Sequence, residues 1–368
     1  MNFKIQREAL LKPLQTICGV VERRQTLPIL SHVLLVSDGE KLTLTATDLE
    51  VEMIATTKIE SSNAGEVTVP ARKFLDICKT LPDDCNIDFN VDGERAILKA
   101  GKSRFTLSTL PAADFPNIDV AQDGNELTIK EAALKSLIDH TQFAMAQQDV
   151  RYYLNGLMLE IAEGKLRSVA TDGHRLAMCE IDADAKNIEA KQIILPRKGV
   201  SELARLLENE NTDVTIEIGN NHIRMRFEEL NFTSKLIDGK FPDYQRVLPQ
   251  NSDKNLVLNR EIFRQALTRA SILSNEKYRG IRLLMDNNTM RIVANNPEQE
   301  EAEEQVELDY SFDPLEIGFN VTYLLDALNA IHTDEVNIAL SDSNSSCLIT
   351  AIGEMAAQCR YVVMPMRL

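Results

Sequence analysis

Six segments of the chain carry apolar residues at the i, i+3, i+4 and i+7 spacing that gathers them on one face of a helix. The six sets, in chain order, are Leu14, Ile17, Cys18, Val21; Phe74, Ile77, Cys78, Leu81; Leu134, Leu137, Ile138, Thr141; Val200, Leu203, Ala204, Leu207; Phe263, Ala266, Leu267, Ala270; and Leu324, Ala327, Leu328, Ile331. Only Thr141 departs from the apolar pattern. A single stripe predicts that each helix packs one face on a sheet and leaves the other for water or a ligand.

Between the helices, polar and apolar residues alternate, which predicts half-buried strands. In the first third of the chain, the strands expected after the first helix are His32–Val36, Lys41–Thr47 and Val51–Thr57, and those after the second helix are Asn86–Val91, Glu94–Ala100 and Ser103–Leu110. Turn-forming pairs at Asp38-Gly39, Glu163-Gly164 and Asn287-Asn288 separate strands at corresponding places. The order of strand, helix and three strands therefore occurs twice in each third of the chain.

Whole segments repeat at a spacing of about 124 residues. Leu44–Asp48 (LTATD) recurs as Ser168–Asp172 (SVATD) and, in degraded form, as Ile292–Asn296 (IVANN). A unit of this length is the size of a complete domain. We therefore predict three tandem copies of one domain: copy one at residues 1–122, copy two at 123–250 and copy three at 251–368. Each copy is α+β, with two helices and two antiparallel sheets.

Composition is that of a globular protein, with 44% hydrophobic and 26% charged residues. No apolar run approaches the ~20 residues that span a membrane, and the first residues lack the apolar core of a signal peptide. We expect a cytoplasmic protein with no membrane partner. The cysteines form no C-x-x-C pair and have no histidine cluster beside them, so we interpret all six as reduced and structural, with no metal site and no cofactor.

The chain has a net charge of −16, which taken alone argues against a nucleic-acid partner. The charge is unevenly distributed, because the six predicted helices together are net positive while the rest of the chain is strongly acidic. Lysine and arginine are good helix formers, but so is glutamate. We favour a basic binding surface on the helices over a mere effect of helix propensity.

Tandem copies joined head to tail use one heterologous interface repeatedly, and such an interface can close a ring. A domain of this size has a radius of gyration of ~14 Å and thus a diameter of ~35 Å. Three such domains leave a hole of only ~5 Å, whereas six leave one of ~35 Å, in which a duplex near 20 Å wide fits. Two chains, each giving three domains, would make the larger ring.

The two chains need an end-to-end contact. The end of copy one is basic and apolar, and copy three carries the acidic run Glu298–Glu304. A charge run is often only a solvated surface; the alternative is a dimer seam that pairs basic and acidic residues around an apolar centre. The candidate seam residues are Lys73, Lys102, Arg104, Phe105, Leu107, Ile272, Leu273, Glu298, Glu300 and Glu304.

Several long segments, in one order over the whole length, resemble the beta subunit of bacterial DNA polymerase III, the replicative sliding clamp. They are Gln25–Leu30 (QTLPIL), Ser108–Pro116 (STLPAADFP), Gln148–Gly156 (QDVRYYLNG), Ala170–Leu176 (ATDGHRL), Ala294–Glu304 (ANNPEQEEAEE) and Tyr361–Leu368 (YVVMPMRL). The resemblance implies a head-to-tail homodimer, a ring of six domains that encircles duplex DNA and tethers the polymerase as a processivity factor. It implies no catalysis.

The resemblance also implies a pocket between copies two and three, where polymerase subunits and the clamp loader insert a short linear motif. The matching positions are Leu154, Thr171, Gly173, His174, Arg175, Leu176, Pro242, Arg246, Val247, Ser346, Val362, Val363, Met364, Pro365, Met366 and Arg367. Methionines suit a surface that adapts to several partners, and Arg175 and Arg246 could fix polar groups of a peptide. From the residues alone, a Met-Pro-Met tail is also compatible with core packing.

Contacts to the duplex implied by the resemblance fall on Arg24, Arg72, Gln148, Tyr152, Tyr153, Arg197 and Lys198. Arg24 follows Arg23 near the expected end of a basic helix, which suits a phosphate contact. Neighbouring tyrosines such as Tyr152 and Tyr153 are often buried anchors, and stacking on bases is the functional alternative.

Two other functions are compatible with parts of the sequence. Asp172 could orient His174 as a catalytic base, but no nucleophile elbow, phosphate loop or metal spacing accompanies this pair, and Asp48 occupies the equivalent place in copy one. The second alternative is a scaffold ring that does not enclose DNA.

Overall fold

A computed structural model describes all residues except 22–26, 119–124, 186–188, 209–210, 251, 356 and 368, with no side-chain description at 61, 62 and 125. The described chain divides into two compact units, residues 1–131 with 201–236 and residues 132–200 with 237–368. Copy one lies within the first unit and copy three within the second, while copy two contributes to both.

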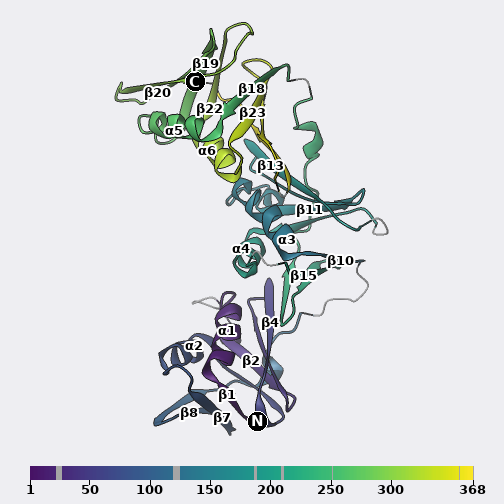
Figure 1. Ribbon diagram of the computed structural model, residues 1–368. Coiled ribbons are helices and arrows are strands. Elements are labelled where there is room, and N and C mark those ends of the chain that lie inside the picture. The colour runs from purple at the N-terminus through teal and green to yellow at the C-terminus, as the bar shows by residue number, and fades with distance from the viewer. Residues whose placement is uncertain are drawn as a thin grey trace. The chain divides into compact units, whose positions relative to one another are not determined.

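Copy one contains the predicted order of elements and one additional short strand, β5, which pairs with β1. Its elements are β1 (Asn2–Gln6), α1 (Arg7–Ile17), β2 (His32–Ser37), β3 (Lys41–Thr47), β4 (Val51–Lys58), β5 (Glu60–Asn63), β6 (Gly65–Pro70), α2 (Ala71–Thr80), β7 (Asn86–Asp92), β8 (Arg95–Ala100) and β9 (Ser103–Ser108). The two helices contact each other and the sheets (Figure 1).

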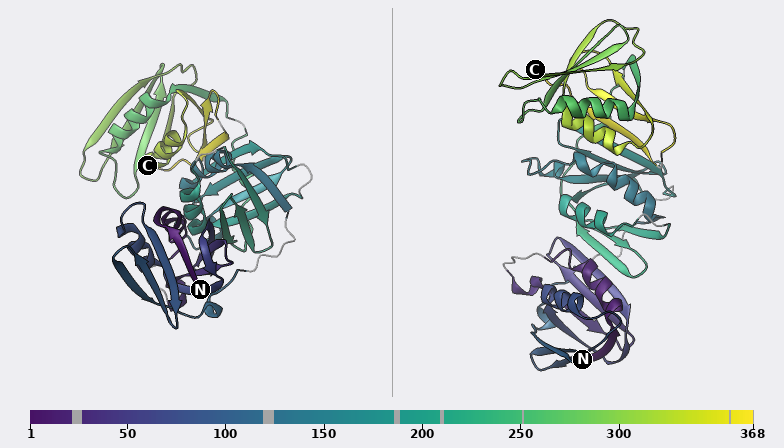
Figure 2. Two further views of the ribbon diagram at one scale, coloured as in Figure 1. Left: turned by 60° about the horizontal axis from the view of Figure 1, so that its bottom comes forward. Right: turned by 60° about the vertical axis from the view of Figure 1, so that its left-hand side comes forward.

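Copies two and three keep the same order. Copy two has β10 (Asn125–Lys130), α3 (Glu131–Asp139), β11 (Gly156–Ala162), β12 (Lys165–Thr171), β13 (Arg175–Asp182), β14 (Lys191–Pro196), α4 (Arg197–Leu206), β15 (Asp213–Ile218), β16 (His222–Arg226) and β17 (Leu230–Lys235). Copy three has β18 (Lys254–Asn259), α5 (Arg260–Ser271), β19 (Gly280–Asp286), β20 (Thr289–Asn295), β21 (Glu301–Glu307), β22 (Leu315–Asn320), α6 (Val321–Ala330), β23 (Glu335–Leu340), β24 (Cys347–Ile352) and β25 (Gln358–Val363). Helices α5 and α6 lie side by side in both views of Figure 2.

The apolar stripes are buried as predicted. Leu14, Phe74, Phe263 and Leu324, one from each helix of copies one and three, are at most 1% exposed. Thr141, the exception in the pattern, is also fully buried, because its hydroxyl donates to the carbonyl of Leu137 at 2.6 Å. A satisfied hydroxyl can replace an apolar group in a core at little cost.

The turns between the first two strands after each first helix also follow the prediction. Glu163, Gly164, Asn287 and Asn288 all have positive φ, which is the backbone of a tight two-residue hairpin. Gly39 has φ +111°, where only glycine is unstrained.

Two eight-stranded sheets cross from one copy to the next. One has the order β10-β15-β16-β17-β4-β3-β2-β6 and the other β14-β11-β12-β13-β25-β24-β23-β18. The antiparallel pairs β17·β4 and β13·β25 are the copy-to-copy junctions. The other two sheets, β5-β1-β7-β8-β9 and β21-β20-β19-β22, each stay within one copy.

Candidate functional site

Many of the predicted pocket residues surround one apolar cluster in the second unit. Its buried members include Leu154, Leu176 and Val362, with Val247 packed against them. They come from four places: the turn before β11, strand β13, the linker after β17, and the end of β25. The fold therefore brings together residues that lie about 200 positions apart in the sequence.

The turn between β12 and β13 is built by its own side chains. The Thr171 hydroxyl donates to the carbonyl of Arg175 at 2.6 Å, and an Asp172 carboxylate oxygen accepts the backbone N–H groups of His174 and Arg175. Gly173 has φ +89°, and a Cβ there would lie 3.0 Å from the Arg151 guanidinium. Asp48 accepts the same pair of backbone bonds in copy one. This supports a structural role for Asp172.

Arg175 is engaged inside the protein. Its guanidinium donates to Asp172 at 3.2 Å, to the carbonyl of Phe143 at 2.8 Å and to Asp326, and it lies 4.5 Å from the centre of the Tyr323 ring. Only 13% of the side chain is exposed. These contacts make Arg175 a support of the turn, and its binding of the polar groups of a peptide stays a prediction.

The C-terminal segment continues from β25 beside the apolar cluster as an extended chain. The Met364 N–H donates to the carbonyl of His174, and the Met366 N–H donates to the carbonyl of Gly318, both at 2.9 Å. Val362 and Val363 are buried, whereas Met364, Pro365 and Met366 are half-buried, as is Ser346, and Arg367 is exposed. The Met-Pro-Met segment is thus only partly packed into the core, and its remaining apolar surface is available to a ligand.

The linker that carries Pro242, Arg246 and Val247 is held by a residue that the sequence analysis did not identify. The Tyr244 hydroxyl donates to the Glu160 carboxylate at 2.6 Å in a buried contact. Burial, and the bond to Glu160, raise the pKa of Tyr244 to about 12. Arg246, by contrast, is 86% exposed and paired with Asp243 at 2.9 Å. Arg246 can approach a ligand, whereas Tyr244 positions the linker.

Glu160 belongs to a network of charges on one sheet. Arg167 donates to Glu160 at 3.0 Å and to Glu180 at 2.9 Å, and Lys165 donates to Glu180 at 2.6 Å. Burial alone would raise the pKa of Glu160, but the bonds from Tyr244, Gln192 and Arg167 outweigh it and hold that pKa below its usual value. Glu160 is therefore an ionised acceptor for Tyr244 at neutral pH.

The loop before β11 contains three of the predicted DNA contacts. Gln148 is exposed with φ +54°, and Arg151 is held over the loop by Asp149 at 2.8 Å. Tyr152 is 58% exposed, whereas Tyr153 packs against the apolar cluster, and their rings meet edge to face at 5.9 Å. Tyr153 is therefore placed as an anchor, whereas Tyr152 is available to contact a ligand.

The other predicted DNA contacts lie at helix starts, except one. Arg72 is exposed on α2 and donates to the carbonyl of Val21 at 2.6 Å, while Arg197 and Lys198 begin α4 and are half-buried. Arg24 lies outside the described residues. Helix α1 ends at Ile17, so the expectation that the helix runs on toward Arg24 was wrong.

The seam residues lie on two edge strands or near them. Arg104, Phe105 and Leu107 are on β9, and Glu304 is on β21. Most of the predicted set is exposed or half-buried: Lys73, Lys102, Arg104, Phe105, Ile272, Leu273, Glu298, Glu300 and Glu304. Glu304 already accepts two bonds of 2.7 Å from Arg269 of its own chain.

The interpretation of all six cysteines as reduced was wrong for two of them. Cys179 on β13 and Cys359 on β25 stand directly opposite each other at the junction and form a disulfide across 180 residues of sequence. Register between distant strands decides this pairing, and sequence spacing does not reveal it. Cys18, Cys78, Cys85 and Cys347 are free thiols.

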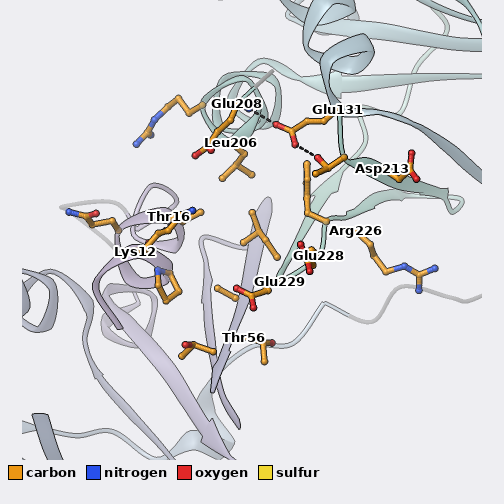
Figure 3. Close-up of a pocket in the computed structure, with 18 of the residues that line it drawn as sticks. Lys12, Thr16, Thr56, Glu131, Leu206, Glu208, Asp213, Arg226, Glu228 and Glu229 are labelled. Carbon is orange, nitrogen blue, oxygen red and sulfur yellow. Dashed lines mark hydrogen bonds between the residues drawn. The ribbon is translucent and has the colours of Figure 1, made fainter. Parts of the chain in front are cut away.

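A cavity of about 1180 Å³ lies in the first unit and is lined by none of the predicted site residues. Figure 3 shows Glu131 at its edge, where the carboxylate accepts bonds from the Glu208 N–H and, at 2.7 Å, from the Thr212 hydroxyl. Within the described residues, no cluster of three metal-ligating side chains occurs, and no helix is long and apolar enough to cross a membrane.

Comparison with known proteins gives one consistent result. Residues 1–119, 128–243 and 245–367 match the N-terminal, central and C-terminal domains of the DNA polymerase III beta subunit. Curated relatives named beta sliding clamp include those of Pseudomonas aeruginosa, 58% identical, and Escherichia coli K12, 51% identical, with each chain covered in full.

Solved structures agree with the sequence comparison. The DNA polymerase III subunit beta of Pseudomonas aeruginosa aligns with a TM-score of 0.97 at 57% identity, and Caulobacter crescentus pol III beta aligns at 0.94 and 38%. Both alignments cover the whole of each chain. The chain therefore belongs to the DNA polymerase III beta subunit family.

Proposed function

We propose that the chain is a sliding clamp: two copies close head to tail into a ring that encircles duplex DNA and tethers the replicative polymerase. The observation that carries the proposal is a strand-to-strand junction between copies that occurs twice inside the chain, while the strands for a third such junction remain at the edges of their sheets. It is a non-catalytic processivity subunit, which we place in the cytoplasm, and its domains are residues 1–122, 123–250 and 251–368.

Each internal junction joins the last strand after a second helix to the third strand after a first helix. These are the pairs β17·β4 and β25·β13. By position in the repeat, the remaining members of the two classes are β9 and β21. Both are edge strands of their sheets in the described chain. Since a heterologous interface used twice can be used again, β9 of one chain should pair with β21 of another.

The internal junctions also predict the register of this seam. Phe232 stands opposite Met53, and Tyr361 stands opposite Ala177. In copy one, the residue equivalent to Phe232 and Tyr361 is Phe105. In copy three, the residue equivalent to Met53 and Ala177 is Ala302. Each of these three residues pairs with the alanine of the repeated segment in its own copy, which is Ala46, Ala170 or Ala294. Phe105 should therefore lie opposite Ala302 of the other chain.

That register matches the two faces of both strands. One residue further along, Arg104 comes opposite Glu303, and both are exposed. Phe105 and Ala302, both half-buried, fall together on the opposite face, which is the face that continues the apolar core. Opposite charges on one face and apolar groups on the other favour this pairing over a slip of one residue, which would exchange the faces.

This register adds Glu303 to the sequence-based list, as the acidic partner of Arg104. Glu304, which is engaged by Arg269 and points to the other face of β21, stays in the proposed seam outside that pair. Lys73, Lys102, Leu107, Ile272, Leu273, Glu298 and Glu300 remain proposed members of the seam.

Duplex DNA would pass through the ring without being read. We assign phosphate and base contacts to Arg24, Arg72, Gln148, Tyr152, Arg197 and Lys198, with Tyr153 as the anchor beside Tyr152. Support comes from the exposure of Gln148 and Tyr152 and from the position of Arg72 and Arg197 at helix starts, where backbone N–H groups also favour anions.

We further propose that polymerase subunits and the clamp loader insert a short linear motif beside the C-terminal segment. The receiving surface comprises Leu154, Thr171, Gly173, His174, Leu176, Pro242, Arg246, Val247, Ser346 and Val362–Arg367, with Arg175 as a support. Its half-buried methionines and the exposed Arg246 support this role.

Topology provides the test of encirclement. The protein is loaded on a nicked circular duplex by a clamp loader and washed in about 0.5 M salt, and the DNA is then linearised. We expect the protein to stay on the circle and to leave after linearisation, because a ring can slide off an end. Equal loss from circular and linear DNA would contradict encirclement and favour a scaffold ring that binds DNA electrostatically or not at all.

A further inference from the structure

Copy three contains a second hollow, of about 450 Å³, beside the end of the described chain. Its lining includes Tyr278 in the turn before β19, Arg282 on β19, Val293 on β20, Pro297 in the following loop, and Met366. Tyr278 is 56% exposed, so its ring is accessible to a ligand in the hollow.

This hollow is the copy-three counterpart of the apolar cluster at the proposed pocket. A shift of 124 residues takes Tyr278, Arg282, Val293 and Pro297 onto Leu154, Met158, Val169 and Gly173. A backbone bond confirms the equivalence: the Ile237 N–H donates to the carbonyl of Ile194, and the Met366 N–H donates to the carbonyl of Gly318, both at 2.9 Å. Ile194 and Gly318 are again 124 residues apart.

In copy two the equivalent surface is covered by the chain itself. After Ile237 the linker continues, and Phe241 and Tyr244, which are 4% and 3% exposed, join the cluster that contains Leu154, Met158 and Val169. The two residues between them, Pro242 and Asp243, are exposed. The covering element is thus Phe-Pro-Asp-Tyr, buried at its first and fourth positions.

Copy one carries a similar element after β9. In Phe115-Pro116-Asn117-Ile118 the first and fourth residues are 9% and 8% exposed, and the asparagine between them is exposed. The preceding turn, Ala112–Asp114, packs on β6. Two copies therefore use a Phe-Pro-polar-apolar segment from the linker that follows their last strand.

The copy-three hollow differs in charge from the cluster in copy two. Arg282 stands where copy two has Met158, and Arg367 adds a second guanidinium, while none of the described lining residues is acidic. Arg282 is paired only loosely, at 3.4 Å, with Glu316, and both side chains are largely exposed. In a chain of charge −16, two arginines in a hollow whose described lining holds no acidic residue favour an anionic ligand.

We propose that the copy-three hollow binds a short segment of another protein, with an aromatic residue, a proline and an acidic residue in the pattern of Phe241–Tyr244. The aromatic ring replaces the linker residues that cover the equivalent surface in copy two, and the carboxylate pairs with Arg282 and Arg367. This site centres on Tyr278 and Arg282, and it shares Met366 and Arg367 with the edge of the proposed partner pocket. It does not depend on the clamp function, since it follows from the internal repeat alone.

The probe is a fluorescein-labelled peptide with the sequence of Gly239–Gln245 (GKFPDYQ), titrated with the full-length protein and read by fluorescence anisotropy. We expect saturable binding that weakens about ten-fold when Arg282→Glu removes the charge-assisted bond, and as much when Tyr278→Ala removes the aromatic wall. In the peptide, Phe241→Ala and Asp243→Lys should each have the same effect. Arg205→Glu, which reverses an exposed charge in copy two, should change the affinity less than about two-fold.

A second control separates this hollow from the partner pocket. Met364→Ala alters the pocket and should leave the peptide affinity unchanged. Binding that is lost with Met364→Ala but kept with Arg282→Glu would overturn the proposal, because the peptide would then occupy the pocket or displace the linker. Absence of saturable binding to the wild-type protein at millimolar concentration would overturn it as well. Arg282→Glu changes an exposed residue, so unaltered thermal unfolding would confirm that the folded state is compared.

Discussion

A charge reversal at the seam tests the register inferred from the internal junctions. Arg104→Glu would place two carboxylates opposite each other at Glu303, and Glu303→Arg would place two guanidinium groups there. The two changes together would restore an ion pair of opposite polarity. A slip of two residues keeps the faces of the strands and would instead bring Arg104 opposite Glu301 or Gln305.

The expected size of the effect follows from cross-strand pairs. An opposite-charge pair directly across an antiparallel ladder contributes about 0.2–1 kcal/mol, and a like-charge pair is unfavourable by a similar amount. Reversal therefore changes the free energy of one seam by about 0.5–2 kcal/mol. Since a closed ring has two seams, the dimer should weaken by about 1–4 kcal/mol, which is roughly a several-fold to several-hundred-fold increase in its dissociation constant.

Sedimentation equilibrium measures the dimer constant for the wild type, the two single variants and the double variant. We expect Arg104→Glu with Glu303→Arg to recover most of the wild-type affinity, with a coupling energy isolated by the double-mutant cycle. The cycle is needed because Glu303 also lies 3.8 Å from Arg291 of its own chain. Arg104→Glu with Glu301→Arg is the matched control. Rescue by Glu301→Arg but not by Glu303→Arg would refute the register.

Three further predictions concern the pocket. Tyr244→Phe removes the hydrogen bond to Glu160. Because folding raises the pKa of Tyr244 to about 12, the protonated hydroxyl stabilises the fold below pH 10, and this stabilisation is lost as the pH rises toward 12. Measured by denaturant unfolding, the wild-type protein should therefore lose more stability than the variant between pH 10 and 12. Asp326→Ala leaves Arg175 without one of its carboxylates and should lower the free energy of unfolding by about 1–3 kcal/mol, measured by chemical denaturation. Deletion of Pro365–Leu368 should abolish binding of a polymerase motif peptide in anisotropy while sedimentation still shows a dimer; loss of the dimer would place this segment at the seam.

The order of elements in the fold could be predicted because it rests on local signals. Apolar stripes, alternating strands and turn residues each act over a few positions, and the repeat supplies each signal three times. Asn287 and Asn288, for example, form the predicted turn because both adopt the left-handed backbone that a tight hairpin needs. Even the irregular Thr141 obeys the pattern once its hydroxyl finds the carbonyl of Leu137.

Contacts across copies could not be predicted in the same way. The disulfide between Cys179 and Cys359 depends on the register of β13 against β25, which only the folded junction defines. The support of Arg175 by Asp326 could not be predicted either, because the two residues lie 151 positions apart in the sequence. No sequence pattern indicated the role of Tyr244, because its partner Glu160 lies on β11, 84 residues earlier in the chain.

The three kinds of junction in the ring need different chemistry although they share one geometry. β17 and β4, like β25 and β13, belong to one chain, so the linker raises their effective concentration and apolar pairs such as Phe232 with Met53 are sufficient. The seam joins separate molecules, and it must also be able to open if DNA is to enter. Exposed pairs such as Arg104 with Glu303 are weak and screened by salt, but they fix register and suppress wrong pairings. Charge is therefore expected where the interface must be specific and reversible. β9 and β21 carry such charged residues, and they are the members of the two junction classes that lie at the edge of their sheets in the described chain.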